Sequence, residues 1–281
     1  MGKLEILNQE ANMFWDNHMH CNFSGDSEAA PIDMINAAKA KGLSGITFTD
    51  HLDIDYPEQF GFFELDLDNY YPTMKALADE NSTEDFTILT GLEIGIQPHV
   101  ADRCNKAASG RPYDFIIGST HVVDGWDPYF ESFWERGDEA ALLKRYYEFI
   151  LENITAFTNF DTLGHLDYAF RYAPTFQTKQ NTHKPYAEII DAILERIIKL
   201  DKALEINTAA FRKGMNAPNP APSIIKRYHE LGGRLITLGA DAHAPEDVAA
   251  DFVRLPDLLE DCGFKEFAVY KNRKPECYPL R

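Results

Sequence analysis

The chain has 281 residues, a length that suits one large α/β barrel and that buries enough surface to fold without disulfides or a structural metal. Its 27 Lys and Arg residues stand against 45 Asp and Glu residues, and the resulting net charge of −18 disfavours a protein that binds nucleic acid over its whole surface. A small phosphorylated substrate is compatible with this charge.

The N-terminal region and the cysteines indicate the cellular location. The first twenty residues lack the basic and apolar segments of a signal peptide, and no apolar run approaches the roughly 18–20 residues of a membrane span. The four cysteines are widely spaced and include no CxxC pair, which favours reduced thiols. We therefore expect a cytoplasmic protein without a membrane partner.

Short apolar segments alternate with longer helical patterns along nearly the whole chain. The expected strands are residues 14–20, 45–51, 87–95, 115–121, 161–166, 203–208 and 234–241. Pro31 and Gly42 bracket one expected helix, and apolar residues recur at helical spacing over 143–157 and 186–200. This alternation predicts right-handed βαβ units, a parallel sheet and a single domain over residues 1–281. The segment 264–270 fits either an extra strand or a tail.

The connections between these elements differ in length. Those from helix to strand are short, whereas four connections from strand to helix are long: 52–68, 122–137, 167–184 and 209–219. In a barrel of alternating strands and helices, the strand-to-helix connections lie at the carboxyl ends of the strands and form the active site. The long connections therefore predict a site at that end.

Histidine and acidic residues gather at the carboxyl ends of the expected strands. Six of the nine histidines lie there: His18, His20, His51, His121, His165 and His243. Glu93 and Asp241 add carboxylates at equivalent positions. Imidazole and carboxylate together bind Zn²⁺, Mn²⁺ or Fe²⁺, and a ligand set without cysteine favours an open catalytic site. One such histidine is usually structural, but the whole set predicts a metal centre.

The motifs HMH, TDH, GLEIG, GSTH, GHLD and GADAH resemble, in order, those of the polymerase-and-histidinol-phosphatase (PHP) family. The segment EINTAAFRKG (205–214) is similar to the histidinol-phosphatase branch. The resemblance implies a distorted (β/α)7 barrel of the TIM type, with its active site at the carboxyl ends of the strands. It also implies two to three divalent ions, whose identity (Zn, Mn or Fe) stays open.

The same resemblance implies which residues hold each ion. The first ion would be bound by His18, His20, Glu93 and Asp241. The second would share Glu93 and add His121 and His165. The third would be bound by Asp26, His51 and His243, and many relatives carry a histidine at the position of Asp26. An aspartate there is still a competent ligand.

The reaction that the resemblance implies is hydrolysis of L-histidinol phosphate to L-histidinol and phosphate, by attack of a metal-activated hydroxide. Asp241, Glu93 and His243 are the expected catalytic residues, with Asp241 a candidate acceptor for the proton of the nucleophile. A nearby acid or the third ion would assist the leaving group, and the sequence leaves that choice open.

Basic and aromatic residues in the long connections are candidates for substrate binding. Arg171 and Arg212 follow the fifth and sixth expected strands, and an Arg fork matches a phosphate group. Lys213 is a further candidate. The connection 52–68 offers acids that could contact the imidazole and ammonium ends of histidinol: Asp53, Asp55, Glu58 and Glu64. The aromatic rings of this connection and of 122–137 either form a lid or pack the loops onto the barrel.

Two other functions compete with this interpretation. A related phosphoesterase would act on phosphotyrosine, a nucleotide or the end of a DNA single strand, and the charge of −18 counts against DNA. The other alternative is a protein that stores metal without catalysing a reaction. A family member that had lost its activity would be expected to lack some metal ligands, whereas every ligand position here holds a plausible residue. The oligomeric state is not predicted.

Overall fold

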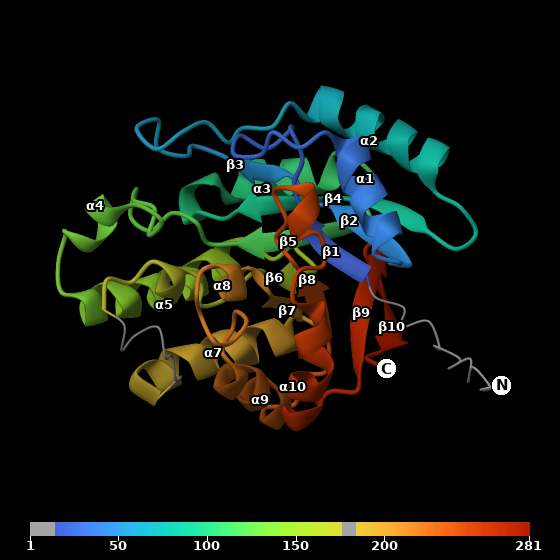
Figure 1. Ribbon diagram of the computed structural model, residues 1–281. Coiled ribbons are helices and arrows are strands. Elements are labelled where there is room, and N and C mark those ends of the chain that lie inside the picture. The colour runs from blue at the N-terminus through green and yellow to red at the C-terminus, as the bar shows by residue number, and fades with distance from the viewer. Residues whose placement is uncertain (1–14, 176–183) are drawn as a thin grey trace.

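The structure is a computed structural model that describes residues 15–175 and 184–281 (Figure 1). Most of the first twenty residues, on which the signal-peptide expectation rests, lie outside the described residues. So does part of the 167–184 connection. Within the described ranges, the helices all fall short of the length and apolar character that crossing a membrane requires.

Seven parallel strands form a nearly closed barrel in chain order. They are β1 (Trp15–Met19), β2 (Gly45–Phe48), β4 (Thr87–Gly95), β5 (Phe115–Ser119), β6 (Thr162–Leu163), β7 (Ala203–Asn207) and β8 (Ile236–Gly239). The first and last strands meet just past their ends, where the Asp241 amide donates to the His18 carbonyl at 2.8 Å and the His20 amide donates to the Ala242 carbonyl at 2.8 Å. The predicted distorted (β/α)7 barrel is confirmed.

The second predicted strand is divided in two. β2 pairs with the first half of β4, and β3 (His51–Asp53) pairs with its second half, where His51 lies opposite Glu93. Between them, the buried Asp50 side chain accepts hydrogen bonds from the Cys21 amide and the Ser24 hydroxyl, both at 2.8 Å. The interruption places a histidine directly beside the carboxylate of β4.

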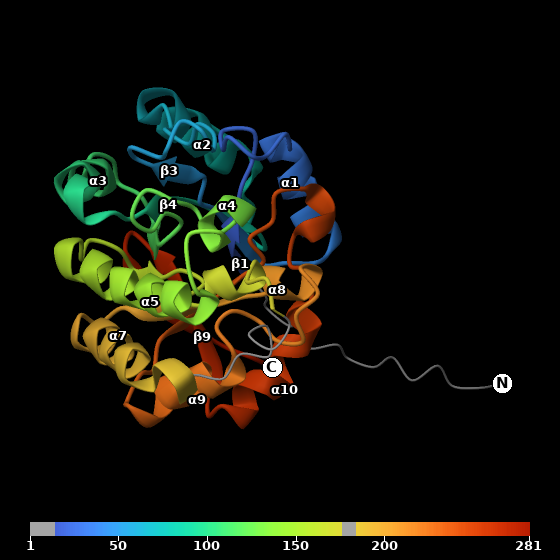
Figure 2. The same ribbon diagram turned by 90° about the vertical axis from the view of Figure 1, so that its left-hand side faces the viewer.

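Helices surround the barrel, as the view along its axis shows (Figure 2). The longer ones are α1 (Pro31–Ala40), α2 (Leu67–Asn81), α3 (Ala101–Ser109), α5 (Glu139–Ala156), α7 (Ala187–Lys199), α9 (Pro222–Glu230) and α10 (Leu255–Asp261). The short helices α4 (Glu131–Trp134) and α8 (Ala209–Arg212) lie in connections at the carboxyl ends of the strands. Single 3₁₀ turns occupy Pro98–Val100, Tyr168–Arg171, Lys184–Tyr186, Pro245–Asp247 and Phe252–Arg254.

The ends of these helices follow from their sequences. Pro31 is the first residue of α1, and Gly42 adopts a left-handed φ of 73° after its last turn, as predicted. The carboxylates of Asp66 and Asp138 accept backbone hydrogen bonds at the start of α2 and α5. The apolar face predicted for α5 is buried against the barrel, with Leu143 at 0% exposure.

The open question about residues 264–270 is answered by an antiparallel hairpin, β9 (Glu266–Lys271) and β10 (Lys274–Pro279). Tyr270 of β9 stacks on Phe115 with 5.3 Å between ring centroids, and Ala268 packs with them. Phe115 is the first residue of its strand, so the hairpin covers the amino end of the barrel, opposite the predicted site.

The hairpin makes a testable contribution to stability. Tyr270 is 3% exposed and its hydroxyl has no hydrogen-bond partner among the described residues. Tyr270→Ala is expected to lower the free energy of unfolding by about 3–5 kcal/mol, because it leaves a cavity the size of a ring. Tyr270→Phe is the matched control and should cost nothing, since no hydrogen bond is lost. Urea denaturation measures both, and equal losses would contradict this packing.

Candidate metal centre

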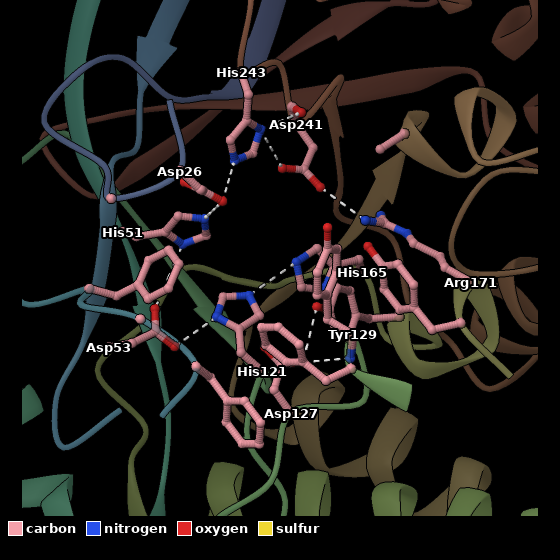
Figure 3. Close-up of a pocket in the computed structure, with 18 of the residues that line it drawn as sticks. Asp26, His51, Asp53, His121, Asp127, Tyr129, His165, Arg171, Asp241 and His243 are labelled. Carbon is pink, nitrogen blue, oxygen red and sulfur yellow. Dashed lines mark hydrogen bonds and ion pairs between the residues drawn. The ribbon is translucent and has the colours of Figure 1, made fainter. Parts of the chain in front are cut away.

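A cavity of about 700 Å³ opens at the carboxyl ends of the strands (Figure 3). Nine of the predicted site residues line it: Asp26, His51, His121, His165, Arg171, Arg212, Lys213, Asp241 and His243. The other three, His18, His20 and Glu93, lie beneath it and are completely buried. The barrel therefore brings all the predicted site residues to one place, as expected when parallel strands end at the same rim.

Donor atoms of four residues gather at the floor of the cavity. The Nε2 atoms of His18 and His20 are 3.1 Å apart, and they lie 3.1 and 3.5 Å from Oε2 of Glu93. Oδ1 of Asp241 is 3.6 and 3.5 Å from the same two nitrogens. A tetrahedron whose corners lie 2.0–2.1 Å from a zinc ion has edges of about 3.3–3.4 Å. The spacing of His18, His20 and Glu93 therefore fits part of the ligand shell of one metal ion, and Asp241 lies within reach of the same two imidazoles.

A second group shares the Glu93 carboxylate. Its Oε1 atom lies 3.2 Å from Nε2 of His121 and 3.0 Å from Nε2 of His165, and these two nitrogens are 3.5 Å apart. These three donors could hold one ion and leave a further position free for water or substrate. Three protein ligands with a free position are typical of catalytic rather than structural metal sites. Glu93 faces both groups, one with each oxygen.

A third group lies toward the rim. Asp26 sits between His243 and His51, with Oδ2 at 3.1 and 3.6 Å from their Nε2 atoms (Figure 3). The rings of His51 and His243 both stack on His20, with centroids 4.1 and 4.2 Å from its own and 5.7 Å from each other. The donor atoms of these three histidines are close enough to hold an ion together. Nδ1 of His51 is also 3.0 Å from Glu93, so this group adjoins the first.

The charges of the buried groups depend on one another. Burial opposes ionisation of Glu93, but His18 and His121 hold its pKa well below the usual value. Burial also opposes protonation of His18, yet Glu93 and Glu205 raise its pKa well above the ordinary value. His20 differs, because burial and the neighbouring His51 lower its pKa. A metal ion would compete with protons for these atoms, since both neutralise the carboxylates.

Three further polar groups hold the outer nitrogens of the predicted ligands. Glu205 contacts Nδ1 of His18 at 2.5 Å, Asp53 contacts Nδ1 of His121 at 2.8 Å, and the Ser24 hydroxyl contacts Nδ1 of His20 at 3.1 Å. Such contacts orient an imidazole so that its other nitrogen faces a metal. Sequence reasoning missed Ser24 and Glu205. An acid between the apolar residues Leu204 and Ile206 of the strand was the one available signal for Glu205.

Asp53 is one of the acids of the 52–68 connection that could contact a substrate, and it is 3% exposed and lines the cavity. Its Oδ1 atom also contacts Nδ1 of His121 at 2.8 Å, a contact that the sequence did not predict. Gly95 makes this position possible, because a Cβ there would lie 1.9 Å from Oδ1 of Asp53.

Arg171 is the most constrained of the predicted phosphate ligands. It is 5% exposed, and its guanidinium donates to Asn219 at 2.5 Å, to Asn207 at 2.7 Å and to Asp241 at 3.1 Å. Figure 3 shows it reaching Asp241 across the cavity wall. Asn219 in turn donates to the buried carboxylate of Asp167. Arg171 is thus a fixed cation beside the first donor group.

Arg212 and Lys213 lie on the same side of the cavity. Nη2 of Arg212 donates to the Ala240 carbonyl at 2.7 Å, and its Nε lies 3.3 Å from Asp247. Its Nη1 is buried without a hydrogen-bond partner among the described residues. Arg212 therefore retains donor capacity next to Asp241.

Some aromatic residues of the two long connections pack their loops onto the barrel, and others line the cavity, as a lid would. Phe133 and Trp134 are buried in the core and pack their loop onto the barrel. Tyr129 is 52% exposed and lines the cavity. Phe60 stacks on Phe130 with centroids 4.5 Å apart, which joins the 52–68 and 122–137 connections at the mouth of the cavity.

The comparisons with known proteins agree with this geometry. A PHP domain model matches residues 16–209, and these contain seven of the nine predicted metal ligands. The chain belongs to the PHP family. It is 32% identical to the histidinol-phosphatase of Lactococcus lactis over 92% of its own length and 95% of the relative's. The probable histidinol-phosphatase of Clostridium acetobutylicum is 30% identical over 90% of this chain and 95% of the relative.

A solved relative shows the same fold with ligands bound. The crystal structure of histidinol phosphate phosphatase from Lactococcus lactis, in complex with zinc, L-histidinol and phosphate, superposes with a TM-score of 0.85 at 29% identity. The match covers 94% of this chain and 99% of the relative. The family relationship therefore extends over nearly the whole barrel, and the His/Glu groups are candidate metal sites within it.

The shared carboxylate gives a direct test of the donor groups. Glu93→Gln keeps the size of the side chain and removes its charge, so we expect bound metal to fall from at least two ions per chain to one or none. Elemental mass spectrometry of gel-filtered protein measures this. Glu64→Gln, in an exposed ion pair with Arg103, is the control and should keep the wild-type content. An unchanged metal content in Glu93→Gln would contradict the shared role.

Proposed function

We propose that this protein is a metal-dependent histidinol-phosphatase, a phosphoric monoester hydrolase that converts L-histidinol phosphate to L-histidinol and phosphate. The observation that carries the proposal is the Glu93 carboxylate, which faces two sets of imidazoles below a cavity that Arg171 and Arg212 also line. The relative solved with L-histidinol and phosphate supports the substrate. A role in histidine biosynthesis would place the protein in the cytoplasm.

The donor groups support two to three divalent ions. His18, His20, Glu93 and Asp241 would hold the first, Glu93 with His121 and His165 the second, and Asp26 with His51 and His243 the third. Zinc in the solved relative favours zinc here, although nitrogen and oxygen donors also suit manganese and iron. When bound, such ions would lower the pKa of a water molecule and neutralise the phosphate oxygens.

Asp241 has the contacts expected of a catalytic carboxylate. Its Oδ1 atom faces the first donor group, while Oδ2 accepts from Arg171 at 3.1 Å and from Asn207 at 3.3 Å. Burial opposes its ionisation, but His18 and Arg171 hold its pKa well below the usual value. Asp241 is therefore ionised, and we propose that it accepts the proton of the attacking water. His243, at the rim, would assist the leaving alkoxide.

The cavity provides opposite charges for the two ends of the substrate. Arg171, Arg212 and Lys213 would bind the phosphate from one side. On the other side, the carboxylate of Asp127 accepts from the Tyr56 hydroxyl at 2.6 Å and lines the same cavity. We propose that Asp127 and the surrounding rings contact the cationic end of histidinol.

A substrate comparison tests the proposal. The metal-loaded protein should hydrolyse histidinol phosphate with a kcat/KM at least about tenfold above that for phosphotyrosine, nucleotides and an aryl phosphate, or about 1.4 kcal/mol of transition-state binding. A chelator should abolish this activity and added metal should restore it. Preference for another phosphate monoester would reject the substrate, and full activity after chelation would reject the metal dependence.

The fixed guanidinium of Arg171 gives a second test. Arg171→Lys keeps the charge and loses the planar fork, so kcat/KM should fall by about 10–100-fold, the effect of losing hydrogen bonds to a charged group. Arg227→Lys is the control, because Arg227 pairs with Asp191 on the outer surface. Steady-state kinetics of both variants measure this. Similar kcat/KM values for the two variants would contradict a role for Arg171 in binding the substrate.

A further inference from the structure

Glu205 is a buried acid whose contacts reach beyond a single metal ligand. It lies in the middle of β7 and is 1% exposed. Alternate residues of a strand share a face, so Glu205 points to the same side as Asn207, whose amide donates to Oε2 at 3.3 Å. Burying an ionised carboxylate is costly unless its oxygens accept hydrogen bonds. The contacts of each oxygen therefore explain why the acid is tolerated here.

The first oxygen of Glu205 fixes the ring of His18. Oε1 lies 2.5 Å from Nδ1 of His18, and an ionised carboxylate can only accept a hydrogen bond. Nδ1 therefore carries the hydrogen, and Nε2 is left to face Glu93 and His20 in the first donor group.

The second oxygen of Glu205 holds the backbone of a ligand in the other donor group. β6 is only two residues long, so His165 lies beyond its ladder. The amide of His165 donates instead to Oε2 of Glu205, at 2.7 Å. This bond fixes the chain at the point from which the His165 ring reaches Oε1 of Glu93. One carboxylate thus contacts His18 on β1 and His165 after β6.

The neighbouring strand leaves room for this arrangement. Gly239 of β8 lies against both partners, because a Cβ there would be 2.6 Å from Oε1 of Glu205 and 2.5 Å from Cβ of His18. Asp53 lies elsewhere, because its Oδ1 atom holds His121 in the second donor group and its Oδ2 atom is 3.7 Å from Nδ1 of His51 in the third. The two acids therefore differ in whether they contact the first donor group.

We propose that Glu205 is a positioning residue for both metal sites, holding His18 through its side chain and His165 through its backbone amide. The inference rests on the proposed function, since it assumes that the two groups bind ions. It predicts that a change at Glu205 weakens the first and second ions, whereas a change at Asp53 leaves the first ion unaffected.

The test compares metal affinities of the purified, full-length protein. Apoprotein is titrated with Zn²⁺ against a chelating dye, which gives a dissociation constant for each ion. Glu205→Gln cannot accept with both oxygens, and we expect the first and second ions to bind about 10–100-fold more weakly. The matched control Asp53→Asn should weaken the second ion, because it disturbs His121, and should leave the first ion at wild-type affinity. Thermal unfolding of each apoprotein checks that the variants fold.

The outcomes separate the inference from the proposed function. If the wild-type protein binds fewer than two ions, the proposed function fails and the inference fails with it. If it binds two or more and Glu205→Gln binds them with wild-type affinity, or loses affinity for only one, the inference alone is overturned. Should Glu205→Gln not fold, Glu205→Asp replaces it. Its carboxylate is one methylene shorter and loses both contacts, so the same weakening of two ions is expected.

Discussion

The ionised carboxylate of Glu93, buried completely at the centre of the barrel, is the constraint on which the rest of the structure depends. A charge in such a place is destabilising unless cations or hydrogen-bond donors surround it. His18 and His51 lie within 3.1 Å of one oxygen, while His121 and His165 lie within 3.2 Å of the other. The observed order of the strands brings the elements that supply these rings around Glu93.

The predicted ligands are oriented by a second layer of polar residues. Asp53, Ser24 and Glu205 contact the outer nitrogens of three ligand imidazoles. Asn219 and Asn207 hold Arg171 beside Asp241 in the same way. A site built like this needs little rearrangement to bind an ion or a phosphate, which is the condition for strong electrostatic stabilisation of a reaction.

Much of this arrangement could be predicted from the sequence, because it depends on local patterns. Apolar runs predict the strands, and the histidines at their ends lie together as soon as the strands are parallel. The division of 45–51 into two strands depends on side-chain contacts of Asp50 with Cys21 and Ser24, which no local pattern reveals. Contacts such as that of Glu205 with His18 join residues 187 positions apart and emerge only from the fold.

The net charge of −18 acquires a more specific meaning in this structure. Three of the acids, Asp26, Glu93 and Asp241, face groups of imidazoles, and two or three bound divalent ions would make the floor of the cavity positive. The surface would then repel polyanions while the cavity attracts a small phosphate ester that carries a positive charge at its other end.

Anomalous diffraction from crystals of the metal-loaded protein tests the central claim most directly. The account predicts at least two peaks, each about 2.0–2.2 Å from a different oxygen of Glu93. One of them should lie among His18, His20 and Asp241, and the other between His121 and His165. A metal-loaded, active protein with no ion at Glu93, or with a single ion elsewhere in the barrel, would contradict the account.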